Sequence, residues 1–316
     1  MSAPERKYVL ISPVRNEGEY LARTIASVAA QTVTPARWVI VDDGSTDDTA
    51  EIVRAAASRH PWISLVQRAD RGGRKVGGGV IDAFYDGLDT VDLEDYGYLC
   101  KLDGDLELPS RYFERLMECF EAEPALGTMS GKTYIDRGDG QRVSERIGDD
   151  MSVGAMKFYR VACFEAIGGF QRVASWDGID CHMCRMNNWL ALSKDEPELR
   201  VHHMRQMGSS QRSLWTGRKR WGWGKYFMGS HPLFVLAVCV YRSLERPWLV
   251  GGLGIAAGYL GAWLRREPRF ANSACRRFIR AYELRCLVHG KAKTVSRLHE
   301  EILARRAAPV PAEVIA

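Results

Sequence analysis

The segment that most constrains the fold of this chain is residues 39–49, which read Val-Ile-Val-Asp-Asp-Gly-Ser-Thr-Asp-Asp-Thr. It predicts a buried strand that ends in two carboxylates, Asp42 and Asp43, followed by a glycine turn and the start of a helix. Two adjacent acids do not fit inside an apolar strand, but at the strand's end they can face a cleft. In open α/β sheets, ligands bind at the carboxyl ends of strands. The segment therefore predicts an α/β fold with a ligand site at one edge of the sheet.

Short apolar runs alternate with stretches that have the spacing of amphipathic helices. The predicted strands are residues 8–12, 38–41, 63–66 and 98–102, and the predicted helices are residues 17–30, 47–60 and 76–88 and a segment that begins at Pro109. This alternation predicts a doubly wound, mainly parallel sheet with helices on both faces. Residues 127–201 are mixed and loop-rich, and we expect this half to hold an acceptor site.

The size and the charge distribution of the chain predict a large core domain and a separate basic region. With 316 residues, of which 46% are hydrophobic, the chain can bury one large domain with an appendage. The net charge is +5, but residues 212–306 carry 19 Lys and Arg against 5 Asp and Glu. We expect a core domain over residues 1–210, a basic, aromatic, helical region over 211–306 and a flexible tail over 307–316. The basic region predicts contact with an anionic surface, either a membrane leaflet or nucleic acid.

Two apolar stretches in the basic region, residues 233–241 and 248–264, favour the membrane. The second has 17 residues, at the lower limit for a spanning helix, and it is bracketed by tryptophans and followed by two arginines, as interfacial anchors are. We predict a membrane-associated region on the cytoplasmic face of the cell membrane; a helical hairpin packed on the first domain is the alternative. Because the basic side chains flank apolar stretches, no nucleic-acid partner is expected. The 8 scattered cysteines fit free thiols in a reducing compartment.

Two further stretches suit phosphate chemistry. Asp103-Gly-Asp105 ends the predicted fourth strand, and two carboxylates on such a turn can hold Mg²⁺ or Mn²⁺ together with a diphosphate. A turn with solvated acids is the alternative, but the acid pair after an earlier strand favours the metal site. Residues 71–79, which include Lys75, are basic and glycine-rich, so their amides and cations can approach a phosphate. Glycine flexibility without a ligand role is the alternative there.

A candidate general base lies in the segment Trp176-Asp177-Gly-Ile-Asp180, which precedes a predicted helix over residues 181–190. A carboxylate at a helix start, beside an aromatic side chain, can accept a proton from an acceptor hydroxyl. An N-cap without a catalytic role is the alternative.

In order and spacing, four motifs resemble those of the family-two glycosyltransferases with the GT-A fold, over about residues 7–205. They are Ser-Pro-Val-Arg-Asn-Glu at 12–17, Val-Asp-Asp-Gly-Ser-Thr-Asp-Asp-Thr at 41–49, Asp-Gly-Asp at 103–105, and Gly-Gly-Phe at 168–170 followed by Trp-Asp at 176–177. The resemblance implies a Rossmann-like GT-A domain, a nucleotide-sugar donor with uridine as the default base, a divalent Mg²⁺ or Mn²⁺ ion, and inversion at the anomeric carbon.

On the donor side, the resemblance implies roles for residues of the first two motifs. Pro13 and Glu17 would lie against the nucleoside, with Arg15 in the same donor-binding motif. Asp43 would hold the base, while Asp42 shapes the turn.

The resemblance also implies a metal site and a base. Asp105 would be the metal ligand, and Asp103 would share that site and lie near the ribose and the sugar. The family carries Glu-Asp at the helix start on the acceptor side, where this chain has Trp176-Asp177. Asp177 would therefore be the base, with Asp180 as the second candidate.

Membrane-bound polymerising relatives carry a Gln-x-x-Arg-Trp motif downstream. This chain keeps Arg220 and Trp221 but has Gly217 in place of Gln, which favours a single-addition enzyme. Arg220 would lie near the pyrophosphate, and the ring of Trp221 would stack on a sugar.

Together these features predict a metal-dependent inverting glycosyltransferase. It would move a sugar from a nucleotide-diphosphate donor, by default a UDP-sugar, to a hydroxyl of a lipid-linked or saccharide acceptor in cell-surface polysaccharide or glycolipid synthesis. A sugar nucleotidyltransferase is the first alternative, disfavoured because residues 13–17 lack a glycine-rich loop with Lys or Arg. A non-catalytic membrane scaffold is the second, disfavoured because every expected acid is present.

Overall fold

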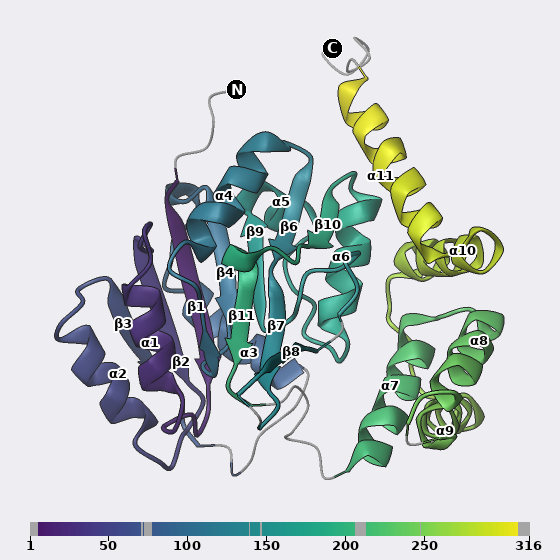
Figure 1. The fold of residues 1–316 in the computed structure, drawn as a ribbon, viewed down its shortest axis with the longest axis horizontal. Helices are drawn as coiled ribbons and strands as arrows, with labels where there is room; N and C mark the ends of the chain where they lie inside the picture. The colour runs from purple at the N-terminus through teal and green to yellow at the C-terminus, as the bar shows by residue number, and fades with distance from the viewer. Residues whose placement is uncertain are drawn as a thin grey trace. The chain divides into compact units, whose positions relative to one another are not determined.

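The computed structural model describes residues 6–70, 72, 78–138, 140–145, 147–205, 213–246 and 248–308. The chain divides into two compact units, residues 1–207 and residues 208–316 (Figure 1). The boundary predicted from the sequence, at residue 210, lies among the undescribed residues 206–212.

A seven-stranded sheet forms the centre of the first unit. Its strands lie in the order β10-β6-β9-β4-β1-β2-β3. Neighbouring strands run parallel except at β9, which is antiparallel to both β4 and β6. The strands are β1 (Tyr8–Val14), β2 (Arg37–Asp42), β3 (Ile63–Gln67), β4 (Tyr98–Leu102), β6 (Leu126–Ser130), β9 (Met156–Arg160) and β10 (Leu190–Ser193). The four strands predicted from apolar runs are confirmed, and the sheet is mixed.

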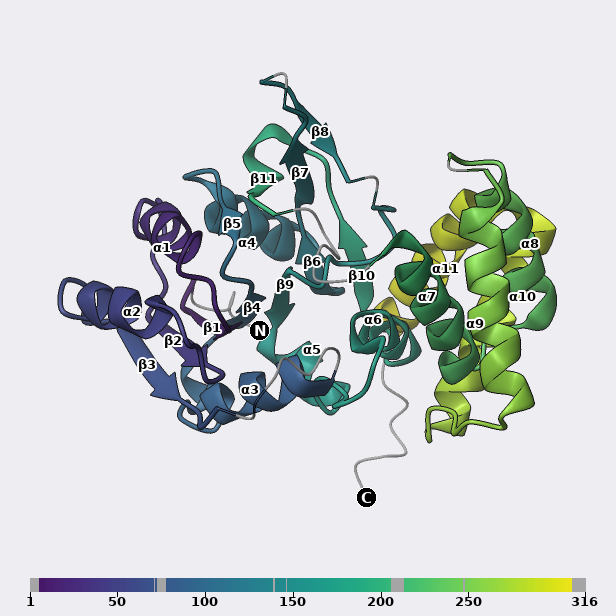
Figure 2. The same cartoon turned by 90° about the horizontal axis from the view of Figure 1, so that it is seen from below.

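Helices cover both faces of this sheet, as the alternation predicts. α1, α2 and α4 lie on one face, and α3, α5 and α6 lie on the other (Figure 2). The helices are α1 (Leu21–Ala29), α2 (Thr49–Ala57), α3 (Gly78–Leu88), α4 (Tyr112–Ala122), α5 (Val161–Ala166) and α6 (Trp176–Met186), with short 3₁₀ helices η1 (Leu93–Asp95) and η2 (Pro197–Leu199).

The prediction for α6 was wrong at both ends. The sequence predicts a helix over 181–190, but α6 begins at Trp176, and Leu190 already belongs to β10. The helix begins early because Ser175, with φ 61° in the left-handed region, turns the chain directly before it. Gly178 is tolerated in the first turn. The candidate base Asp177 therefore lies within the helix rather than before it.

The loop-rich prediction for residues 127–201 was also wrong. These residues contain regular elements and contribute to a second sheet of four strands in the order β5-β11-β7-β8. Its strands are short or mixed in polarity, so they show no apolar run from which a strand could be predicted. They are β5 (Leu106–Glu107), β7 (Lys132–Asp136), β8 (Arg142–Ser144) and β11 (Arg200–His203).

An aromatic cluster fixes the antiparallel strand β9 in the middle of the main sheet. The ring of Phe158 lies 5.2 Å from that of Tyr98 and 5.5 Å from that of Phe120. It also packs against Phe113 at 5.8 Å and Tyr8 at 5.9 Å. Burial of one such side chain contributes about 1.5–3 kcal/mol, and each well-placed ring pair adds about 0.5–1.5 kcal/mol. The cluster thereby joins β9, β4 and β1 to α4.

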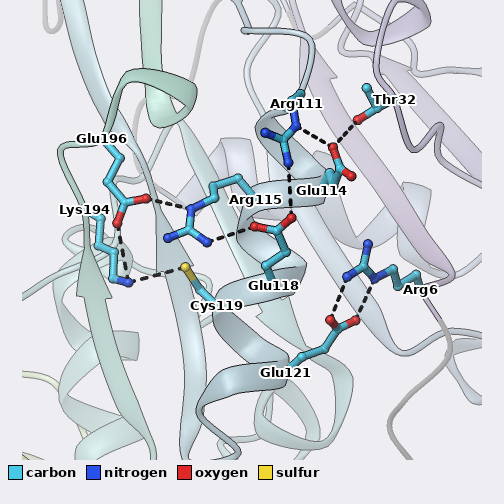
Figure 3. Close-up of polar contacts among 10 residues, drawn as sticks. All are labelled: Arg6, Thr32, Arg111, Glu114, Arg115, Glu118, Cys119, Glu121, Lys194 and Glu196. Carbon is cyan, nitrogen blue, oxygen red and sulfur yellow. Dashed lines mark hydrogen bonds and ion pairs between the residues drawn. The ribbon is translucent and has the colours of Figure 1, made fainter.

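The outer face of α4 carries a network of charged side chains (Figure 3). Arg6 donates two hydrogen bonds of 2.7 Å to Glu121, which ties the N-terminal segment to the helix. Arg115 bonds Glu118 at 2.9 Å and Glu196 at 2.7 Å, which ties the helix to the segment after β10. Because exposed ion pairs contribute roughly 0–1 kcal/mol each, this network orients α4 more than it stabilises the unit.

The second unit is helical. Its helices are α7 (Leu214–Met228), α8 (Pro232–Ser243), α9 (Val250–Leu264), α10 (Ser273–His289) and α11 (Lys291–Ala307). The predicted apolar stretches 233–241 and 248–264 correspond to α8 and α9. Within the described part of the chain, every helix is too short or too polar to cross a bilayer.

Glycines bring α7 and α9 into backbone contact. A Cβ on Gly222 would lie 1.9 Å from the carbonyl oxygen of Ile255, and a Cβ on Gly258 would lie 1.9 Å from the carbonyl oxygen of Lys219. No real Cβ fits at such a distance, so any larger residue would push the two helices apart. The glycine content of α9 therefore serves close helix packing.

We expect Gly258→Ala to lower the free energy of unfolding by about 1–3 kcal/mol, because the added methyl overpacks the contact between α7 and α9. The matched control is Gly261→Ala in the same helix, where the nearest atom to the new Cβ is Nη1 of Arg265, at 3.2 Å on a flexible side chain. The control should be neutral or stabilising by up to about 1 kcal/mol. Urea unfolding followed by circular dichroism measures both, and equal midpoints for the two variants would contradict the packing argument.

Candidate active site

The loops that follow β1 and β2 are bonded to each other. Oδ1 of Asn16 accepts the N–H of Thr46 at 2.8 Å, and the N–H of Asn16 donates to Oγ of Ser45 at 2.9 Å. The N–H of Glu17 donates to Oγ1 of Thr49 at 2.9 Å. Asn16 has φ 53°, in the left-handed region that Asn adopts more readily than most residues. These bonds hold both loops together at the carboxyl edge of two adjacent parallel strands.

Asp42 and Asp43 have different partners. Oδ1 of Asp42 accepts the N–H of Ser45 at 2.8 Å, so Asp42 shapes the turn after β2. Oδ1 of Asp43 is 2.7 Å from Nη1 of Arg68, and Arg15 donates to the carbonyl oxygen of Asp43. Asp43, the residue expected to hold the base, is therefore itself held by two arginines from neighbouring loops.

Asp103 and Asp105 follow β4. Lys101 donates to the carboxylate of Asp103, whose side chain is 34% exposed. Oδ2 of the buried Asp105 lies 2.9 Å from Nη2 of Arg205 and 3.6 Å from Nε2 of His203. Burial raises the pKa of Asp103. Burial also acts to raise the pKa of Asp105, but His203 and Arg205 outweigh it, so this pKa lies below its ordinary value.

Two residues at this edge, His203 and Arg205, were missed from the sequence. Burial acts to lower the pKa of His203, but the carboxylates of Asp105 and Glu145 raise it to about 9. Nη2 of Arg205 also bonds Oε1 of Glu17 at 2.7 Å, so it joins the loop after β1 to the turn after β4. The sequence signal for these two residues is His-His-Met-Arg at 202–205, where charged or titratable side chains again lie at the end of a strand.

The donor atoms at this edge suit a divalent cation by their chemistry. Carboxylate oxygens of Asp103 and Asp105 suit Mg²⁺ or Mn²⁺. Among the described residues, however, no group of three or more His, Cys, Asp or Glu is arranged to hold a metal. Asp103 is bonded to Lys101 and Asp105 to Arg205, so each carboxylate has a cationic partner. Asp105 with Asp103 remains the pair that would hold the ion.

The two candidate bases on α6 differ in exposure. Asp177 lies in the first turn of the helix and is exposed. Asp180 is fully buried; its carboxylate lies 2.6 and 2.8 Å from Nζ of Lys157, and it accepts a hydrogen bond from the hydroxyl of Tyr159. A buried, ion-paired carboxylate cannot reach an acceptor hydroxyl, so the geometry favours Asp177.

Asp177 and Asp103 are linked by a short series of contacts. Nζ of Lys101, which bonds Asp103, also donates to the carbonyl oxygen of Gly154 at 3.0 Å. A Cβ on Gly154 would lie only 3.1 Å from Oδ2 of Asp177, so this glycine packs directly on the candidate base. These contacts connect the candidate base to the turn that follows β4.

The remaining predicted residues are in different places. Pro13 is buried in β1, where it is paired with Val41 of β2. Lys75 lies outside the described residues. Arg220 and Trp221 lie on α7 of the second unit, where arginines of α7 and α8 are 5.3 and 5.0 Å from the centroid of the Trp221 ring. Their expected place at the donor site stays a prediction.

The mixed α/β sheet with acids at the carboxyl ends of β2 and β4 has a GT-A-like fold, and solved structures share this fold. The mannosyltransferase PcManGT from Pyrobaculum calidifontis, solved in complex with GDP-Man and Mn²⁺, aligns with a TM-score of 0.51 at 17% identity, covering 97% of this chain and 87% of that one. GalNAc-T7, solved with UDP, GalNAc and Mn²⁺, aligns with a TM-score of 0.59 at 13% identity, covering 96% of this chain and 58% of that one.

Residues 9–190 match the model of glycosyl transferase family 2, so the chain belongs to that family. Among curated proteins it is 32% identical over 125 residues to the glycosyltransferase alr2836 of Nostoc sp., which is 39% of this chain and 36% of that protein. It is 34% identical over 74 residues to the chondroitin synthase of Escherichia coli, which is 22% of this chain and 11% of that protein. The chain thus covers well under two thirds of either relative.

We expect Gly44→Ala to destabilise the turn that carries Asp43. Gly44 has φ 73°, and a Cβ there would lie 2.5 Å from Cα of Asp70. Gly72 is the matched control because it has the same φ of 73° but, among the described residues other than its chain neighbours, no atom within 4 Å of the new Cβ. Gly72→Ala should cost about 1 kcal/mol through its backbone conformation alone, and Gly44→Ala about 2–4 kcal/mol because the clash adds to it. Thermal unfolding measures both, and equal losses would show that the contact with Asp70 is not constraining.

Proposed function

We propose that this chain is an inverting glycosyltransferase that moves a sugar from a nucleotide-diphosphate donor, by default a UDP-sugar, to an acceptor hydroxyl. The observation that carries the proposal is the series of contacts from Asp103 through Lys101 and Gly154 to Asp177. This series connects an exposed carboxylate to the acids at the carboxyl end of β4, which supports the proposal. The family assignment and the nucleotides bound by the structural neighbours support it.

The proposed reaction is a single displacement. The acceptor oxygen forms a bond to the anomeric carbon while the bond from that carbon to the diphosphate breaks on the opposite face. Asp177 takes the acceptor's proton as its oxygen attacks. Asp43 and Glu17 would orient the nucleoside, and Asp103 would orient the ribose and the sugar. A Mg²⁺ or Mn²⁺ ion held by Asp105 and Asp103 would supply positive charge for the leaving diphosphate.

We expect Asp177→Asn to lower kcat by about 10²–10⁴-fold, because the amide cannot accept the acceptor's proton. The side chain is exposed, so melting temperature and donor affinity should stay close to wild type. The assay follows nucleoside diphosphate release from a panel of nucleotide sugars with Mn²⁺. Retained turnover would move the base elsewhere, and pyrophosphate as the product would support a nucleotidyltransferase instead.

For the acceptor, we propose a lipid-linked hydroxyl presented at the cytoplasmic leaflet, in surface polysaccharide or glycolipid synthesis. Among the described residues, the exposed large apolar side chains all belong to the second unit. On α8 and α9 they recur at spacings of three, four and seven, so each helix presents one apolar stripe to solvent. The stripe residues are Leu233, Leu236, Val240 and Leu244 on α8 and after it, and Leu253, Leu260 and Leu264 on α9.

Cationic side chains lie at the ends of these stripes. Arg246 lies in the connection from α8 to α9, and Arg265 and Arg266 lie at the end of α9; all three are exposed. Trp248 and Trp263, at the two ends of α9, are 60% and 55% exposed. Apolar stripes with aromatic and basic ends suit the interface of an anionic leaflet. This arrangement supports a unit that lies on the membrane through α8 and α9.

We expect the double variant Leu236→Glu with Leu260→Glu to lose binding to vesicles of phosphatidylethanolamine and phosphatidylglycerol. Each buried leucine contributes about 1.5–3 kcal/mol, so partitioning should fall by at least about tenfold. Leu303→Glu on α11, where the leucine is 38% exposed, is the control and should bind as wild type. Flotation assays measure the bound fraction. Equal flotation of both variants would contradict a membrane role for the α8 and α9 stripes.

A further inference from the structure

We propose that Lys157 is a positioning residue. It holds the first turn of α6 and thereby orients the carboxylate of Asp177 toward Asp103 and Asp105, the acids that follow β4. The inference depends on the proposed role of Asp177 as the base. Lys157 itself would not touch the substrate, because it is fully buried under α6.

The ammonium group of Lys157 has a full set of partners. Its Nζ donates to the carboxylate of Asp180 at 2.6 and 2.8 Å and to the main-chain oxygen of Asp177 at 2.8 Å. Oγ of Ser152 and Sγ of Cys181 are each 3.2 Å away. Burial acts to lower the pKa of Lys157, but the charge of Asp180 outweighs it and holds the pKa above its ordinary value. The group is therefore a charged lysine whose protons are directed at one helical turn.

The first turn of α6 has no side-chain cap of its own, and strand β9 bonds it from the sheet. The N-cap residue, Ser175, has a left-handed backbone and makes no side-chain hydrogen bond to the helix. Strand β9 contacts this turn through two side chains two positions apart, which therefore point to the same face of the sheet. Lys157 bonds Asp177 and Asp180, and Tyr159 donates to the carboxylate of Asp180.

Lys157 also connects the start of α6, which carries Asp177, to the turn after β4, which carries Asp103. Lys157 lies directly opposite Lys101 in the pairing of β9 with β4. Their Nζ atoms are 5.6 and 5.5 Å from the ring centroid of Trp176, which occupies the position where the family carries Glu. Cations over an aromatic face are attracted to it, so the ring offsets part of their mutual repulsion. Through Lys101 the cluster reaches Asp103, and through Lys157 it reaches Asp177.

Lys157→Met alone would leave the carboxylate of Asp180 buried without its cation, which destabilises a protein strongly. The test is therefore the double variant Lys157→Met with Asp180→Asn, which removes both charges at nearly constant volume. We expect it to fold, to bind UDP within about twofold of wild type, and to lose about 10–100-fold in kcat, because a displaced base costs about that much. Arg115→Met with Glu196→Gln removes an ion pair remote from Asp177 and serves as the control, with kcat unchanged.

A second measurement separates positioning from a purely structural role. If Lys157 acts through Asp177, the charge-free double variant should cause no further loss of kcat once Asp177→Asn is present. An unchanged kcat in the double variant, or a fully additive loss in the triple variant, would overturn the inference. Full turnover of Asp177→Asn alone would instead overturn the proposed role of Asp177, so the two failures are distinguishable.

Discussion

Two lysine side chains, Lys101 and Lys157, are buried opposite each other on β4 and β9 in the middle of the main sheet. A buried ammonium group is tolerated only when negative charge or hydrogen-bond acceptors surround it. Asp103 meets this requirement for Lys101, and Asp180 meets it for Lys157. Because Asp103 ends β4 and Asp180 belongs to α6, neutralising the two lysines fixes the turn after β4 and the start of α6 relative to each other. The placement of the candidate active site follows from that charge balance.

The other half of the site depends on strand direction. β1 and β2 are parallel neighbours, so their carboxyl ends meet at one edge, and the loops that follow can exchange hydrogen bonds through Asn16. β11 of the small sheet then brings Arg205 to Glu17 and Asp105. The guanidinium of Arg205 therefore joins two loops whose acids, Glu17 and Asp105, are 88 residues apart in sequence. Backbone direction brings the acids together, and the added cations keep them from repelling one another.

The sequence predicted those parts of the fold in which local pattern and burial agree. Apolar runs located β1, β2, β3 and β4, and acids at strand ends located Asp43, Asp103 and Asp105. It failed where the pattern is weak: β11 reads Arg-Val-His-His, so neither the strand nor the role of His203 was visible. The start of α6 was missed because Ser175 adopts the left-handed backbone conformation, which a serine in the sequence does not predict. The sequence could not decide between Asp177 and Asp180 as the base. Only the fold shows that Asp180 is buried, because it packs against Lys157 and Tyr159, which are distant from it in sequence.

In the second unit, close helix packing on one face of α9 is combined with exposed apolar side chains on the other. Gly222 and Gly258 bring α7 and α9 to backbone contact, and Tyr226, Ile255 and Tyr259 fill the buried cluster beside that contact. The leucines of α9 and its tryptophan point outward, and Leu253, Leu260 and Trp263 are each more than half exposed. In water such a stripe is unfavourable by about 25 cal/mol for each Å² left uncovered. The outward apolar stripe is therefore the physical basis of the proposed membrane contact, in which the stripe would meet an apolar environment and the arginines at its ends an anionic one.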